Sequence, residues 1–113
     1  MHVIDYRHET ATPAWALRSI DLIYGEACYR FRRATRNRCE AELKAATDAV
    51  QRVADVLMAG ATPFVTFKRV QRMRVERDAR TKIDIGGVVD LMVHMELQRR
   101  DPRSKYAKLE LAA

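Results

Sequence analysis

Hydrophobic residues recur every three or four positions along the first half of the chain, in two successive stripes. The first consists of Leu17, Ile20, Tyr24, Ala27, Phe31 and Ala34, and the second of Cys39, Leu43, Ala46, Val50, Val53 and Leu57. This spacing is typical of amphipathic helices. The second stripe is rotated from the first by roughly a quarter of a turn. We therefore predict a break or kink at residues 35–38, and one long helix that contacts different neighbours along its length is the alternative.

Turn-forming residues indicate the other helix boundaries. Thr12 and Pro13 favour a helix start, and the sequence AGATP at 59–63 favours the end of one helix and the start of the next. Residues 64–76 have helical spacing but are rich in types that favour strands, so we prefer a helix and leave a strand open. Residues 83–87, IDIGG, are expected to form a loop or a helix start.

A last helix is predicted by an apolar face near the C-terminal end of the chain. The face consists of Val88, Leu91, Met92 and Met95, and Asp101-Pro102 ends the helix. We expect this face to lie in the core. Val89 and Val93 widen the apolar surface until little of the helix is polar, so one side of it is expected to contact another subunit.

These patterns predict an all-α fold, a small bundle of three to five helices with a long or kinked N-terminal helix. A chain of 113 residues suits a single domain over 1–113, with residues 1–12 as an N-terminal arm and 104–113 as a C-terminal tail. The low aromatic content of 7% also favours helices over a β-sandwich. We expect a cytoplasmic protein, because no apolar run is long enough for a membrane span and no secretory signal is recognisable.

Basic charge is concentrated in two segments of the chain, which has a net charge of +6. Residues 27–39 hold five arginines and no acid, and residues 66–82 hold seven basic and two acidic residues, a net charge of +5 in each segment. Arginine binds phosphate oxygens with two hydrogen bonds and stacks on bases. We predict nucleic-acid contacts at Arg30, Arg32, Arg33, Arg36, Arg38, Lys68, Arg69, Arg72, Arg74, Arg77 and Arg80, and we expect the two segments to converge into one positive surface.

The basic residues occupy several helical angles, which favours contacts to the sugar-phosphate backbone of DNA or RNA without sequence preference. Four aromatic residues near the segments could stack on bases: Tyr29, Phe31, Phe64 and Phe67. Residues 53–74 also fit a helix-turn-helix whose second helix would read DNA. Two further interpretations are a helical adaptor for acidic protein partners and a charged surface that is merely solvated.

Motifs of enzymes and metal sites are missing from the sequence. It contains no GxSxG, no glycine-rich phosphate loop and no HExxH. Cys28 and Cys39 are too far apart on one helix for a disulfide and lack zinc-site spacing. We therefore predict a non-enzymatic protein with no cofactor and no metal, which works as a homo-oligomer or as a small subunit of a nucleoprotein complex.

Overall fold

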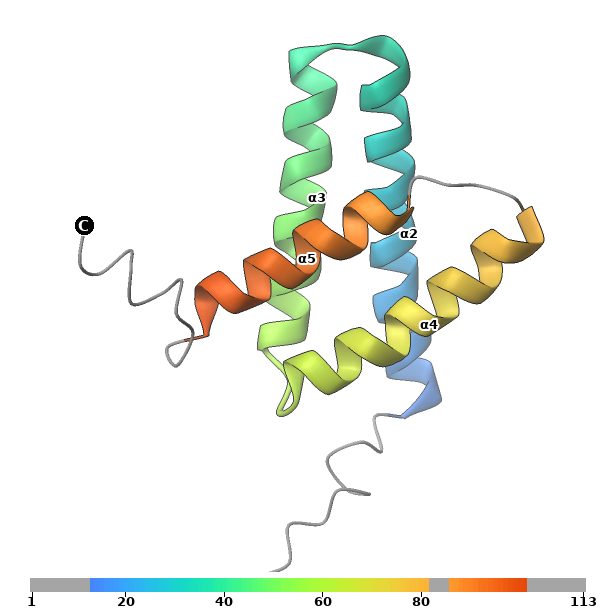
Figure 1. Cartoon of the computed structure of the whole chain (residues 1–113). Helices are drawn as coiled ribbons and strands as arrows, with labels where there is room; N and C mark the ends of the chain where they lie inside the picture. The colour runs from blue at the N-terminus through green and yellow to red at the C-terminus, as the bar shows by residue number, and fades with distance from the viewer. Residues whose placement is uncertain (1–12, 82–85, 102–113) are drawn as a thin grey trace, which may run out of the picture.

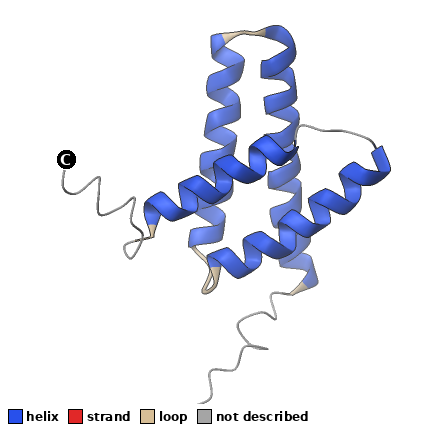
Figure 2. Ribbon diagram, in the orientation of Figure 1, coloured by secondary structure: helices blue, strands red, loops and turns tan. Residues whose placement is uncertain are grey.

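The computed structural model describes residues 13–81 and 86–101, and all the regular elements in these ranges are helices (Figures 1 and 2). They are α2 (Ala14–Asn37), α3 (Glu40–Met58), α4 (Pro63–Thr81) and α5 (Gly86–Arg100). The predicted all-α bundle with a long N-terminal helix is confirmed. Residues 64–76 lie within α4, so the helix is correct there and the strand is not. The predicted arm at 1–12 and tail at 104–113 lie outside the described residues.

The first two helices form an antiparallel hairpin, and α4 and α5 cross one face of it (Figure 1). The predicted break lies at Arg38 and Cys39, which connect α2 to α3. Arg38 has a left-handed backbone (φ 50°), and its amide donates to the carbonyl oxygen of Ala34 at 2.9 Å. A residue in this conformation ends the helix and turns the chain, as at many helix C-termini. The two apolar stripes can therefore face each other.

The boundaries around the second connection follow the turn residues. Helix α3 ends at Met58, and the Gly60 amide donates to the carbonyl oxygen of Leu57 at 3.1 Å. Pro63 is the first residue of α4, a position where the missing amide hydrogen of proline costs nothing. Near the N-terminus, α2 begins at Ala14, directly after Pro13, where the sequence favoured a helix start.

The core lies where the hairpin meets α4 and α5. Both predicted stripes contribute to it, and the largest fully buried side chains are Tyr24, Leu57, Phe67, Val53, Val70, Val89, Val93 and Leu97. The rings of Tyr24 and Phe67 pack with their centroids 6.4 Å apart. Two members of the second stripe depart from the expectation, since Leu43 is half exposed and Cys39 is exposed. Cys39 lies in the α2–α3 connection and Leu43 in the first turns of α3, both near the tip of the hairpin and away from the core.

The predicted buried face of α5 is wrong for three of its four members. Val88, Leu91 and Met95 are 50%, 59% and 55% exposed, whereas Val89 and Val93 are fully buried. Apolar residues cover most of the surface of this helix, so periodicity alone does not select the buried side. The buried side of α5 is instead determined by Asp90, because the Asp90 carboxylate is hydrogen-bonded within the core.

A buried polar cluster joins α2, α4 and α5. Asp90 accepts hydrogen bonds from the Tyr24 hydroxyl, from Gln71 Nε2 at 3.1 Å and from Arg74 Nε at 3.1 Å, and its carboxylate also pairs with Arg74 Nη2. Arg74 Nη1 binds Asp78 Oδ2 at 2.8 Å. Burial and the Asp90 carboxylate raise the pKa of Tyr24, so its hydroxyl stays protonated and can donate. Charges enclosed this well must be paired, and here they are.

Gly86, the first residue of α5, leaves room for this cluster because it has no side chain. A β carbon at Gly86 would overlap the side chain of Arg74 and the Asp78 carboxylate. The helix start therefore approaches α4 more closely than any other residue type would allow. Gly87, the next residue, has no heavy atom within 4 Å of such a position.

Candidate nucleic-acid interface

The arginines of α2 gather around one open hollow near the tip of the hairpin. Arg32, Arg33 and Arg36 line it together with Tyr29 and Asn37, and its volume is about 360 Å³. Arg32 and Arg36 follow Tyr29 by three and seven residues, so the three side chains lie along one side of the helix. This surface lies away from the buried stripe. A positive hollow of this kind suits an anion with several oxygens.

One of the three arginines in the hollow, Arg33, is positioned by protein contacts. Arg33 Nη2 binds Glu42 Oε1 at 3.1 Å, and its guanidinium lies over the Tyr29 ring, 5.9 Å from the centroid. The Tyr29 hydroxyl and then Glu42 raise the pKa of Arg33, which stays charged. Arg32 is partly buried, and its Nε is enclosed without a hydrogen-bond partner among the described residues. Ordering the Arg33 guanidinium in advance lowers the entropic cost of binding a ligand.

The carboxylate of Glu42 is the acid closest to this group in the described structure. Hydrogen bonds from Asn37 Nδ2 at 2.8 Å and from Arg33 lower the pKa of Glu42. It is therefore ionised and offsets one of the three guanidinium charges. Arg32 and Arg36 make no ion pair with the described residues, so the hollow keeps a positive excess.

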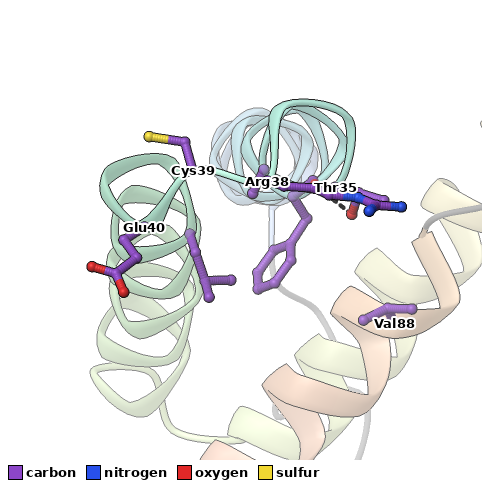
Figure 3. Close-up of a pocket in the computed structure, with 8 residues that line it drawn as sticks. Thr35, Arg38, Cys39, Glu40 and Val88 are labelled. Carbon is purple, nitrogen blue, oxygen red and sulfur yellow. Dashed lines mark hydrogen bonds between the residues drawn. The ribbon is translucent and has the colours of Figure 1, made fainter.

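The other two predicted contacts of the first segment differ from each other. Arg30 pairs with Glu26 on its own helix, with 2.8 Å between Nε and Oε1. Arg38 is exposed at the hairpin tip and pairs with no described acid. It also borders a second hollow of about 420 Å³ between the tip and α5 (Figure 3). That hollow is mostly apolar, with Phe31, Leu43 and Val88 in its walls.

Arg74 is a correction to the predicted interface. Its side chain is 9% exposed and pairs with Asp78 and Asp90, so it cannot reach a phosphate backbone. The physical reason is that Asp90, sixteen residues later in the chain, requires a buried cation. Burial opposes the charged form, but the hydrogen bonds to the two carboxylates outweigh it and raise the pKa of Arg74.

Two further α4 arginines are already engaged within the protein. Arg77 Nη1 binds Asp21 Oδ2 of α2 at 2.7 Å. Arg69 is partly buried and also interacts with the rest of the protein. Lys68, Arg72 and Arg80 are exposed and make no ion pair with the described residues. The second segment therefore offers fewer open charges than its sequence indicates.

The two segments meet only in part. Arg77 approaches Gly25, which lies on the same side of α2 as Arg32 and Arg36 but two to three helical turns before them, and no residue of α4 lines the arginine hollow. Lys68 and Arg72 lie on the outward side of α4, opposite its buried residues. The expected single positive surface is thus replaced by one surface on α2 and a smaller one on α4.

Of the four aromatic residues near the segments, Tyr29 is the one with a substantially exposed ring, at 44%. Phe31 and Phe67 are buried in the core, and Phe64 is partly buried against it. Asn37 and Glu42 belong to the site and were absent from the sequence prediction. An asparagine at a helix end and an acid in the first turn of the next helix are common for local reasons, so neither gave a signal.

No known protein family, curated protein or solved structure matches this chain. Within the described residues, no helix meets the length and apolarity that a membrane span requires. These residues also contain no group of three or more His, Cys, Asp and Glu side chains placed to hold a metal ion.

Proposed function

We propose that this chain is a non-enzymatic nucleic-acid-binding protein that contacts the sugar-phosphate backbone through Arg32, Arg33 and Arg36 of α2. The main support is that these three guanidinium groups line one open hollow, where Glu42 is the one acid among the described residues that pairs with them. Phosphate oxygens accept the paired hydrogen bonds that arginine donates. Arg38 at the hairpin tip is a further exposed charge, which borders the second hollow and not this one.

Binding without sequence preference suits this geometry. Lys68, Arg72 and Arg80 of α4 add further charge at other angles, which fits contacts to phosphates more than a fixed reading of base edges. The protein would act in the cytoplasm, as an oligomer or as a small subunit of a nucleoprotein complex.

Fluorescence anisotropy with unrelated single- and double-stranded DNA and RNA at two salt concentrations tests this function. With five or six phosphates contacted, we expect a slope of about −5 for log affinity against log salt on duplex DNA. The double variant Arg32→Ala/Arg36→Ala should bind every sequence more weakly and reduce the magnitude of that slope by about 2 for each chain that contacts the nucleic acid.

Lys44 and Arg52 of α3 provide the matched control. Both are exposed and lie outside the two basic segments, so Lys44→Ala/Arg52→Ala removes the same net charge elsewhere. It should leave the slope close to that of the wild type. Equal losses of affinity in the two double variants would mean that binding depends on the net charge of the protein and not on a particular site. Absence of binding at low salt would favour an adaptor for acidic protein partners.

A helix-turn-helix is the second candidate, since Lys68 and Arg72 lie on the outward side of the helix that follows the α3–α4 turn. In that case Lys68→Ala/Arg72→Ala should abolish the preference for one cognate sequence and leave binding to unrelated DNA largely intact. An equal loss on all sequences would exclude this reading.

A further inference from the structure

Three large apolar residues are exposed in a row on the outward side of α2. Trp15, Leu22 and Tyr29 are 66%, 76% and 44% exposed, and each is seven residues from the next. Residues seven apart lie almost above one another on a helix, so the three form one line opposite the buried stripe. The core of the monomer makes no use of them. Such a line on the longest helix is typical of a seam between two packed helices.

The residues around Leu22 are arranged symmetrically. Trp15 precedes it by seven positions and Tyr29 follows it by seven, while Arg18 precedes it by four and Glu26 follows by four. Two copies of α2 packed antiparallel about Leu22 would therefore bring Trp15 opposite Tyr29 of the partner subunit and Arg18 opposite Glu26 of the partner subunit. A parallel pair would instead place Arg18 opposite an identical arginine. Self-complementarity of this kind is what a two-fold interface requires.

We propose that a second copy of this chain docks on this face, with the two α2 helices antiparallel and the two-fold axis at Leu22. The charges fit such a partner. Arg18 is exposed and pairs with no described acid, and Glu26 keeps 43% of its side chain exposed while bonded to Arg30. Ser19, three positions before Leu22, is small and exposed and lets the helices approach.

The dimer places the two arginine hollows at a defined separation. Arg32, Arg33 and Arg36 lie ten to fourteen residues beyond Leu22, which is about 18 Å along the helix, so the two hollows are about 35 Å apart. A two-fold axis perpendicular to the helices keeps both hollows on the same side of the dimer. One turn of B-form DNA is about 34–36 Å. This step rests on the proposed function, and it names duplex DNA as the nucleic acid that the dimer fits.

Light scattering and sedimentation of the purified chain test the dimer directly. We expect twice the mass of the chain for the wild type and a monomer for Leu22→Glu, with circular dichroism unchanged because Leu22 is exposed. Trp15 is the only tryptophan, so dissociation on dilution should shift its emission to longer wavelength. The matched control is Leu91→Glu on α5, which is also exposed and should remain a dimer.

Charge exchange tests the antiparallel register. Arg18→Glu and Glu26→Arg should each weaken the dimer, and the two together should restore it, because the pairs re-form with opposite polarity. A monomeric wild type, or a dimer that dissociates with Leu91→Glu and not with Leu22→Glu, would overturn the proposal. So would a double exchange that fails to recover association.

The nucleic-acid consequence has a separate readout. Leu22→Glu should bind duplex DNA more weakly, with about half the salt slope of the wild type, since each monomer offers one hollow. A wild-type dimer that binds no nucleic acid would refute the proposed function and leave the dimer in place. A wild-type monomer that binds nucleic acid through Arg32 and Arg36 would refute the dimer and leave the proposed function in place.

Discussion

Replacing Asp90 of α5 with alanine removes the carboxylate on which hydrogen bonds from two other helices, α2 and α4, converge. The Tyr24 hydroxyl, Gln71 and Arg74 all donate to Asp90, and Arg74 and Asp90 are 8% and 6% exposed. The substitution would leave a buried guanidinium with Asp78 as its remaining acidic partner. Removing one member of a buried pair costs about 3–5 kcal/mol. Since a domain is stable by roughly 5–15 kcal/mol, the loss would be a large part of the total.

Urea and thermal unfolding followed by circular dichroism measure this loss. For a domain of this size, we expect Asp90→Ala to lower Tm by on the order of 10–20 °C. The double variant Arg74→Met/Asp90→Leu removes both of these charges and should lose less stability than Asp90→Ala, because no guanidinium stays buried beside a missing carboxylate. Asp78 loses its Arg74 partner in this variant but keeps 14% of its side chain exposed to water. The double variant will not be neutral, since the Tyr24 hydroxyl and Gln71 lose their acceptor.

A cost below about 1 kcal/mol for Asp90→Ala would refute this reasoning, because it would mean that Arg74 reaches water without the carboxylate. The same experiment bears on the interface. If Arg74 is a core residue, the folded double variant should bind nucleic acid with the affinity of the wild type. A loss of binding in that variant would return Arg74 to the site.

Three further predictions concern the helix start, the cysteines and an acid of α5. Gly86→Ala should destabilise the fold by about 1–3 kcal/mol, because its β carbon overlaps buried atoms, whereas Gly87→Ala should be neutral or stabilising in the same urea titration. Burial raises the pKa of Cys28 to about 11, so with dithionitrobenzoate at pH 8 the exposed Cys39 should react at once and Cys28 only on unfolding. Hydrogen bonds from Arg99 and then from Arg100 lower the pKa of Glu96 below its usual value of 4.5. The stability that the ionised Glu96 carboxylate contributes is therefore present above about pH 4.5 and is lost as the pH falls further. In Glu96→Gln the free energy of unfolding should fall less steeply as the pH is lowered into this range.

Periodicity and turn residues were sufficient to predict the helices of the hairpin and their connection. The two stripes of α2 and α3 differ in angle, and the left-handed Arg38 lies where that difference predicted a break. The buried side of α5 could not be predicted, because valine, leucine and methionine occur on nearly all sides of it. The side depends on Asp90 and its partner Arg74, a contact between helices that spacing within either helix does not reveal.

The interface was predicted in outline, since a run of arginines without acids is visible in any sequence. Which arginines remain open is a tertiary property. Arg77 is neutralised by Asp21, fifty-six positions earlier in the chain, and Arg33 is held by Glu42 across the hairpin turn. Acids at such distances cannot be assigned to a given arginine from sequence alone. The hollow itself also depends on Asn37 and Tyr29 lying beside those arginines.

Equal net charges in the two basic segments do not mean equal contributions to binding. Each segment holds two arginines bound to carboxylates, Arg30 and Arg33 in the first and Arg74 and Arg77 in the second. The difference lies in how the open charges are placed, since Arg32 and Arg36 line one hollow and Lys68 and Arg72 do not. Counterion release depends on cations that meet phosphates, and cations gathered in one hollow meet them together. The α2 double variant Arg32→Ala/Arg36→Ala should therefore weaken duplex binding more than Lys68→Ala/Arg72→Ala, although each removes two positive charges. Anisotropy titrations at one low salt concentration compare them directly, and a larger loss from the α4 pair would move the interface to the outward side of α4.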